Sequence, residues 1–294
     1  MTVAASNSTR ISKRFAELRA SGELGIVAYI TAGDPSLEAT LQFVLSLASA
    51  GADVIELGVP FSDPLADGPT IQRASERALK SGTTLAGVID LVHRVRQWDS
   101  SPFPPNELRL VNEVPIVLFS YYNPILQMGL EKFASAAEAA GADGVLATDL
   151  TPEESEEYRR ILGEHHLDTI FLGAPTSTDE RLAKIAGCSS GFLYLISRTG
   201  VTGAKDALPD DLPALLRRAR GVTQLPIAVG FGISLPGHVS VLGGLADAAV
   251  VGSALVSEIE KAKSVEAGAA ALAERVRALK EAARHGLSRR EVAP

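Results

Sequence analysis

Cysteine is almost absent from this chain, and aromatic residues are few. Cys188 is the only cysteine among 294 residues, so no disulfide can form within the chain, and the composition is compatible with a reducing cytoplasm. The role of a small buried residue suits Cys188 better than that of a nucleophile. No apolar run approaches the ~18 residues needed to span a bilayer, and the N-terminus lacks the apolar core of a signal sequence. We therefore expect a soluble cytoplasmic protein.

Charge and histidine content exclude further classes of protein. A net charge of −7 argues against nucleic acid as a partner. The five histidines show no paired ligand spacing, so we expect no metal site. No serine-nucleophile elbow and no Walker motif occur, and Leu235 stands where a dinucleotide fingerprint would need its third glycine.

Short apolar runs that alternate with helix-like segments dominate what is present. The eight runs cover residues 25–30, 53–57, 115–119, 144–147, 169–172, 192–196, 226–229 and 248–251. Helices are expected to follow them over residues 36–50, 69–81, 131–140, 152–165, 178–186, 209–220, 236–243 and 253–261. Strict alternation predicts an α/β fold with a parallel sheet, and eight units predict closure into a (β/α)8 TIM barrel that forms a single domain over residues 1–294.

Three predicted helices exceed the eight units. They are an N-terminal helix (8–21), an extra helix after the second βα unit (84–97) and a long C-terminal helix (264–284). Residues 99–113 are expected to form a surface loop, and residues 1–7 and 285–294 flexible ends. Gly-Ala-Asp or Leu-Ala-Asp precedes three of the strands, and we expect Asp53, Asp143 and Asp247 to serve stability at the N-terminal face of the barrel.

The run from residue 56 to residue 70, ELGVPFSDPLADGPT, places charge where a buried strand ends. Glu56 follows an apolar strand, so its carboxyl should be desolvated and its pKa raised, which suits proton transfer. Pro60, Pro64 and Pro69 stiffen the loop that carries Asp67. Glu56 and Asp67 are predicted to face each other across a pocket. None of the predicted strands contains a lysine that could form a Schiff base.

Glycine-containing turns follow the last three predicted strands: SRTGVTG (197–203), GFGIS (230–234) and VGSAL (251–255). Glycines let backbone N–H groups approach an anion, and the helix that begins near Ser253 adds its N-terminal dipole. Turn formation and helix capping are the alternative role for any single glycine. In a barrel the loops after strands seven and eight commonly bind phosphate, which makes Gly203, Gly232, Gly252 and Ser253 the candidates.

The loop sequences resemble those of the α subunit of tryptophan synthase. The resemblance runs from about residue 8 to about residue 284 and is strongest in the loop after strand two. It is carried by ITAGDP (30–35), ELGVPFSDPLADGPTIQ (56–72), YNPI (122–125), YLISRTGVTG (194–203), VGFGIS (229–234) and VGSALV (251–256).

The resemblance implies a lyase that cleaves indole-3-glycerol phosphate to indole and glyceraldehyde 3-phosphate in L-tryptophan biosynthesis. It implies an α2β2 complex with a β subunit that carries pyridoxal phosphate, and no cofactor in this chain. Matched motif to motif, the catalytic glutamate falls on Glu56 and the catalytic aspartate on Asp67. Substrate-binding positions fall on Tyr121, Asp149, Tyr194, Thr202, Gly203, Phe231, Gly232, Gly252 and Ser253.

The resemblance gives two loops a role in contact with the β subunit. The segment 198–208 would be a mobile lid that meets the β subunit, with Thr202 contacting Asp67, and residues 60–69 would form the other part of that contact. Asp63, which precedes Pro64, suits turn formation there better than chemistry. Before Asp149 the residues Ala147-Thr148 replace the more usual Val-Pro, so the edge of the pocket is expected to differ.

Three alternatives stay open. A different phosphate-binding barrel, such as a sugar-phosphate isomerase, would share the late glycines but not the loop after strand two. A stand-alone lyase would release free indole without a β subunit. A noncatalytic barrel that only activates a β subunit is disfavoured by the presence of both Glu56 and Asp67.

Overall fold

The computed structural model describes residues 9–98, 111–197, 208–230 and 232–288, with side chains up to residue 284. Its strands are all parallel and follow the order β5-β4-β3-β2-β1-β9-β8-β7-β6. They are β1 (Gly25–Thr31), β2 (Val54–Gly58), β3 (Ile116–Ser120), β4 (Gly144–Ala147), β5 (Asp168–Ile170), β6 (Leu172–Gly173), β7 (Leu193–Ile196), β8 (Ile227–Gly230) and β9 (Ala248–Val251).

The two ends of this strand order are consecutive in the chain, which makes the sheet a barrel. Strand β5 pairs with β4, strand β6 pairs with β7, and only Phe171 separates β5 from β6. The backbone carbonyl of Phe171 accepts a hydrogen bond from the Tyr194 N–H at 3.3 Å. The nine strands therefore correspond to the eight predicted ones, the fifth being interrupted where it changes partner, and the predicted (β/α)8 barrel is confirmed.

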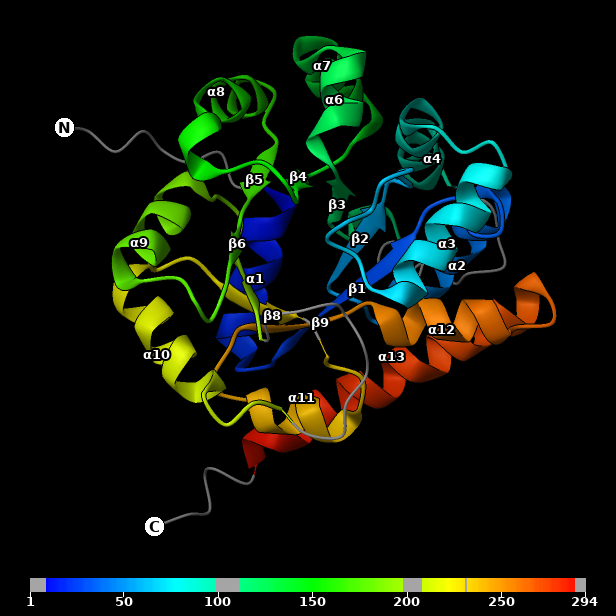
Figure 1. Cartoon of the computed structure of the whole chain (residues 1–294). Coiled ribbons are helices and arrows are strands. Elements are labelled where there is room, and N and C mark those ends of the chain that lie inside the picture. Colours follow the sequence, from blue (N-terminus) through cyan, green and yellow to red (C-terminus); the bar gives the residue numbers. More distant parts are fainter. Residues whose placement is uncertain (1–8, 99–110, 198–207, 231, 289–294) are drawn as a thin grey trace.

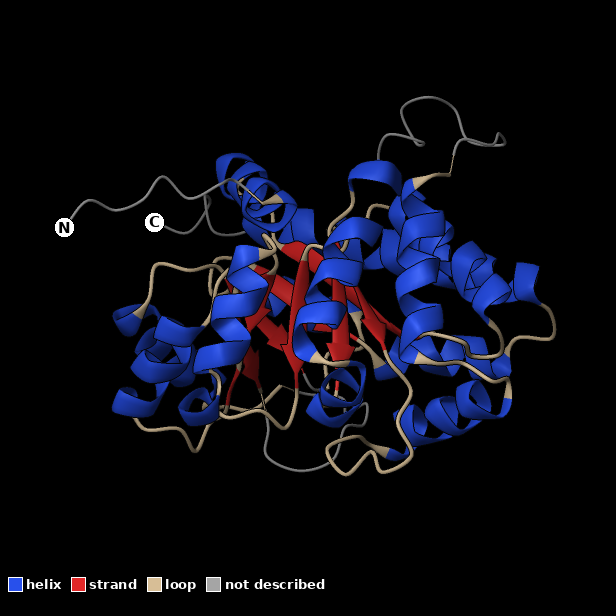
Figure 2. Cartoon of the chain, turned by 90° about the horizontal axis from the view of Figure 1, so that it is seen from above, coloured by secondary structure: helices blue, strands red, loops and turns tan. Residues whose placement is uncertain are grey.

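Helices surround the strands as a ring, except for α1, which lies inside the ring (Figure 1), and Figure 2 shows helices on both sides of the sheet. They are α1 (Arg10–Ser21), α2 (Leu37–Ser49), α3 (Pro69–Lys80), α4 (Leu85–Arg96), α6 (Tyr122–Met128), α7 (Leu130–Ala140), η1 (Pro152–Glu154), α8 (Glu156–Glu164), α9 (Asp179–Cys188), α10 (Leu212–Val222), α11 (Pro236–Leu242), α12 (Ser253–Lys261) and α13 (Val265–Ser288). The three extra helices predicted from the sequence are α1, α4 and α13. No helix within the described ranges is long and apolar enough to cross a membrane.

Four local expectations were wrong. Residues 111–113, assigned to the 99–113 surface loop, are helical, and Val111 is fully buried; residues 99–110 lie outside the described part. Helix α6 was not expected, because it is only seven residues long. The helix expected over 152–165 is broken at Ser155, and α10 begins three residues later than the predicted Pro209. Short elements and helix starts depend on local capping, which periodicity does not resolve.

Side chains alternate between two apolar cores along each strand. Outward residues such as Ile55 and Leu57 pack beneath the helices, in the larger core. Inward residues such as Val27 and Val54 pack in the barrel with Phe15 of α1, which closes its N-terminal end. Burial on both faces explains why the strands read as nearly continuous apolar runs. On β2 the next inward position after Val54 is occupied by Glu56.

Aspartates at the N-terminal ends of strands tie neighbouring strands together, as expected. Asp53 accepts the Ile26 N–H at 2.6 Å, and Asp143 accepts the Ile116 N–H at 2.7 Å. Asp247 accepts the N–H of Ile227 at 2.7 Å. Each carboxylate also pairs with basic side chains, those of Asp53 being Arg14 and Lys280. The repeated motif thus satisfies a backbone donor at the start of an adjacent strand with a charge-assisted hydrogen bond.

Candidate active site

The carboxyl group of Glu56 is enclosed by the barrel, near the C-terminal end of β2. Its side chain is fully buried, and neither oxygen has a hydrogen-bond partner within the described part of the chain. Burial raises the pKa of Glu56 from 4.5 to about 8, because the charged form loses its hydration. The side chain is therefore mostly protonated at neutral pH and able to donate a proton, as the sequence predicted from its position.

Tyr29 stands beside Glu56 and was missed by sequence reasoning. The two residues are directly paired in the register of β1 and β2, and the Tyr29 ring meets Phe119 edge-on at 5.2 Å. A Cβ atom on Gly58 would lie 2.2 Å from the Tyr29 hydroxyl oxygen, so only glycine leaves room for that hydroxyl. Burial, then the charge of Asp67 and more weakly that of Glu56, raises the pKa of Tyr29. Its hydroxyl thus lies within electrostatic reach of both carboxylates.

Asp67 is held by the loop between β2 and α3. The Tyr121 hydroxyl donates to Asp67 Oδ2 at 3.1 Å and accepts the Ala66 N–H at 2.9 Å. The Tyr121 ring stacks on Phe61 with centroids 4.9 Å apart, which fixes the other arm of the loop. Burial raises the pKa of Asp67 from 3.8 to about 6, while the Tyr121 hydrogen bond acts in the opposite direction. At neutral pH Asp67 is therefore mainly a carboxylate, whereas Glu56 is mainly a carboxylic acid.

Backbone N–H groups gather at the turns after β8 and β9. Helix α12 begins at Ser253 with Gly252 as its N-cap, and its first internal bond is donated by Val256 to the Gly252 carbonyl at 3.0 Å. The preceding N–H groups of the first turn therefore have no partner inside the helix and can meet an anion. Gly232 adopts φ +94°, a conformation that favours glycine. A Cβ on Gly252 would lie 3.4 Å from the Tyr29 ring, so this turn adjoins the carboxylates.

The other predicted positions divide into three groups. Tyr194 is buried in the barrel, and burial, followed by the nearby charge of Glu56, raises its pKa. Asp149 is exposed and accepts the Tyr122 N–H at 2.7 Å, so it caps the start of α6. Thr202, Gly203 and Phe231 lie outside the described residues, as does most of the predicted lid. In the described ranges no three His, Cys, Asp or Glu side chains come together as metal ligands.

Comparison with known proteins gives the family. The family model described as "Tryptophan synthase alpha chain" matches residues 15–284. The chain belongs to the tryptophan synthase alpha chain family. It is 49% identical to the alpha chain of Solibacter usitatus over 253 residues, covering 86% of this chain and 90% of that one. With the alpha chain of Citrifermentans bemidjiense it shares 50% identity over 258 residues, covering 88% and 92%.

Solved structures agree with this relationship. The tryptophan synthase alpha subunit of Legionella pneumophila str. Paris superposes with a TM-score of 0.82 at 36% identity, covering 94% of this chain and 99% of the other. A chain of Mycobacterium tuberculosis tryptophan synthase gives a TM-score of 0.82 at 33% identity, covering 94% and 98%.

As a tryptophan synthase alpha chain, the protein is a lyase that cleaves indole-3-glycerol phosphate to indole and glyceraldehyde 3-phosphate in tryptophan biosynthesis. The alpha chains of this family require no cofactor, and the pyridoxal phosphate of the synthase belongs to the β subunit. The sugar-phosphate isomerase and the purely noncatalytic barrel are therefore set aside as readings of this chain.

Two signals could have found Tyr29. It is an inward residue two positions after Val27, and Gly58 stands two positions beyond Glu56 on the neighbouring strand, where a large hydroxylated ring needs space. The same arrangement recurs on the other side of the barrel, where a Cβ on Gly230 would lie 2.3 Å from the Tyr194 hydroxyl oxygen. A glycine at the C-terminal end of one strand, next to a strand that carries a tyrosine, thus indicates where the tyrosine hydroxyl lies.

Proposed function

We propose that Glu56 shuttles the proton of the cleavage reaction. In its acid form it donates a proton to indole C3, and the resulting carboxylate removes the proton of the adjacent glycerol hydroxyl. The carbon–carbon bond then breaks, its electron pair restores the aromatic indole, and the hydroxyl carbon becomes the aldehyde. Glu56 regains its proton, so the cycle balances. A fully buried carboxyl without a hydrogen-bond partner, with a pKa of about 8, is the observation that supports this role.

Asp67 is assigned to the indole nitrogen. Protonation of C3 leaves a positive charge on the ring, shared with the nitrogen, and a carboxylate that accepts the N–H stabilises that charge. Asp67 suits this task because its pKa of about 6 keeps it ionised at neutral pH. Its hydrogen bond from Tyr121 fixes one oxygen and leaves the other for the substrate.

The substrate phosphate is assigned to the opposite end of the site. The α12 N-terminus at Gly252 and Ser253 and the turn at Gly232 supply backbone donors, and the positions Gly203 and Phe231 are proposed with them from the motif match. Tyr29 fills the space between this turn and the carboxylates. The phosphate would thereby set the depth at which the indole ring enters the barrel, with Tyr194 in its wall.

Measuring indole release from indole-3-glycerol phosphate tests the two carboxylate roles. Glu56→Gln should lower kcat by about 10²–10⁴-fold and Asp67→Asn by about 10²–10³-fold, because each removes a proton transfer or a stabilising charge. Asp63→Asn is the matched control, since Asp63 lies on the same loop but is exposed. Near-normal turnover by either site variant in folded protein would refute its role.

A β subunit is the proposed partner, in an α2β2 complex located in the cytoplasm. Leu65, on the loop that carries Asp67, is 89% exposed, so this large apolar side chain is available to be buried by a partner. The cleavage assay with and without a purified β subunit tests this proposal. Strong activation that Leu65→Ser abolishes would support the synthase, while unchanged activity would favour a stand-alone lyase that releases indole.

A further inference from the structure

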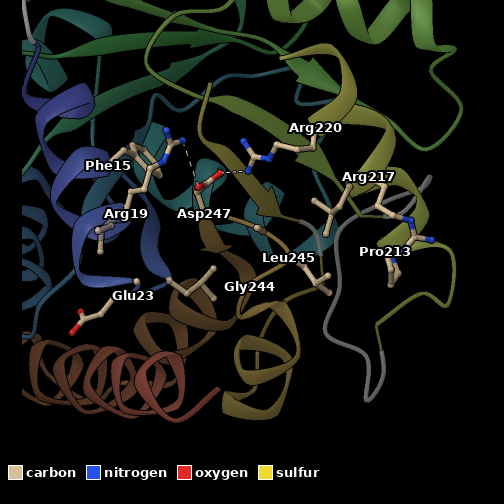
Figure 3. A pocket seen from close by; sticks show the side chains of 14 residues that line it. Phe15, Arg19, Glu23, Pro213, Arg217, Arg220, Gly244, Leu245 and Asp247 are labelled. Carbon is tan, nitrogen blue, oxygen red and sulfur yellow. Dashed lines mark hydrogen bonds and ion pairs between the residues drawn. The ribbon is translucent and has the colours of Figure 1, made fainter. Parts of the chain in front are cut away.

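A cavity lies at the end of the barrel opposite the proposed active site. It has a volume of about 380 Å³ and lies between α1, α10 and the turn before β9 (Figure 3). Leu24 precedes β1 and Asp247 precedes β9, so the cavity belongs to the N-terminal ends of the strands. Its floor is apolar, formed by Phe15 of α1, Leu216 of α10 and Leu245 of the turn. The size falls within the range typical of small-molecule sites.

The acidic groups of this cavity are already engaged. Asp247 accepts the Ile227 N–H and forms an ion pair with Arg220. Glu23 points away from Asp247 in Figure 3 and pairs with Arg284 at 3.3 Å and with Lys280 at 3.7 Å. Asp247 is thus the one carboxylate that faces both Arg19 and Arg220 among the described residues that line the cavity, so the positive charge there exceeds the negative charge.

Two arginines retain unused donors. Arg19, on the last turn of α1, forms a long ion pair with Asp247 Oδ1 at 3.8 Å, a distance that is too long for a hydrogen bond. Its side chain is 58% exposed. Arg217, on α10, lies at the other rim beside Pro213 in Figure 3. Within the described ranges neither guanidinium donates a hydrogen bond to protein. Each guanidinium carries five N–H donors in a planar fork that matches a carboxylate.

We propose that this cavity binds a small organic carboxylate with an apolar body. Its carboxylate lies on Arg19, next to the Arg19–Asp247–Arg220 cluster, and its body covers Leu216 and Leu245. Arg217 adds a favourable charge at the rim. An apolar floor below guanidinium groups with unused N–H donors selects against a neutral ligand, which leaves those donors unused. It also selects against inorganic phosphate, which leaves the floor uncovered.

Phenylacetate and phenylacetamide test the charge requirement, because they share shape and differ in charge. Each is titrated into the full-length chain while leucine methyl resonances are followed, with inorganic phosphate as a third probe. We expect phenylacetate to bind about tenfold more tightly than the amide or phosphate. Arg19→Ala should weaken phenylacetate about fivefold or more, Arg19→Lys less, and Arg217→Ala about twofold, as the fork and then the rim charge are lost.

Arg277→Ala is the matched control, because Arg277 is an exposed arginine on α13 that does not line the cavity. Its affinity for phenylacetate should equal that of the unmodified chain. Equal binding of acid and amide, equal binding of phosphate, or phenylacetate binding that Arg19→Ala leaves unchanged would each overturn the proposal, the last by placing the ligand elsewhere, for instance in the indole pocket.

Discussion

Replacing Glu56 by glutamine should stabilise the protein at neutral and alkaline pH while removing its activity. The physical reason is the unpaired burial of the carboxyl, which raises its pKa from 4.5 to about 8. Because the folded state holds the proton more tightly than the unfolded chain, the contribution of Glu56 to stability is complete below about pH 4.5 and is lost as pH rises to about 8. Glutamine is neutral at every pH and nearly the same size, so it escapes this loss.

The magnitude follows from the two pKa values. With 1.36 kcal/mol for each unit of separation, the ionisation of Glu56 costs the wild-type protein about 1 kcal/mol at pH 5, about 3 kcal/mol at pH 7 and about 5 kcal/mol at pH 9. A pH-independent difference between glutamine and glutamic acid cancels when the pH 5 value is subtracted. The stability advantage of Glu56→Gln should therefore grow by about 4 kcal/mol between pH 5 and pH 9.

Urea unfolding of both proteins at pH 5, 7 and 9 measures this advantage as a difference in unfolding free energy. Glu180→Gln, at an exposed position of α9, is the control and should follow the wild type within about 0.5 kcal/mol. An advantage that is constant with pH, or that shrinks as pH rises, would show that Glu56 is not a desolvated acid. The assignment of Glu56 as proton donor would then lose its basis.

Three further predictions concern the neighbours of Glu56. The pH profile of kcat/KM for indole release should be bell-shaped, because kcat/KM rises as Asp67 ionises near pH 6 and falls as Glu56 ionises near pH 8. A flat profile over this range would contradict the assigned protonation states. Tyr121→Phe should move the acid limb upward, because the ionised form of Asp67 loses a hydrogen bond, and the shift is read from the same profile. Gly58→Ala should destabilise the fold by about 1–3 kcal/mol in urea unfolding, because the new Cβ would lie 2.2 Å from the Tyr29 hydroxyl; an unchanged midpoint would show that the ring moves freely.

Sequence pattern predicted the repeating parts of the fold well. Eight apolar runs were recognisable because burial on both faces removes polar residues from the strands, and Glu56 stood out against that background. The interruption at Phe171 was not recognisable in the sequence. The fifth strand changes partner there through backbone hydrogen bonds, which do not depend on the type of side chain. Helix α6 escaped for a related reason: its start is capped by Asp149, which is 27 residues away in the chain.

The two candidate carboxylates also show some features that the sequence predicted and others that only the structure revealed. Glu56 and Asp67 were predicted as a pair from one loop motif, and the burial of Glu56 followed from its strand. Tyr121 was predicted only as a substrate-binding position, and its hydrogen bond to Asp67 required the end of β3 and the β2–α3 loop to meet. Tyr29 lies within an apolar strand, and its closeness to Glu56 depends on the pairing of β1 with β2.

By itself the sequence determined the α/β alternation, the barrel and the position of a charged group at the end of β2, because periodic burial and turn chemistry are local properties of the chain. Only the tertiary structure decided that Glu56 lacks a hydrogen-bond partner among the described residues, that Tyr29 lies within reach of both carboxylates, and that Arg19 keeps unused donors beside Asp247. Desolvation and charge proximity arise from atoms brought together by folding, so no local pattern in the chain records them.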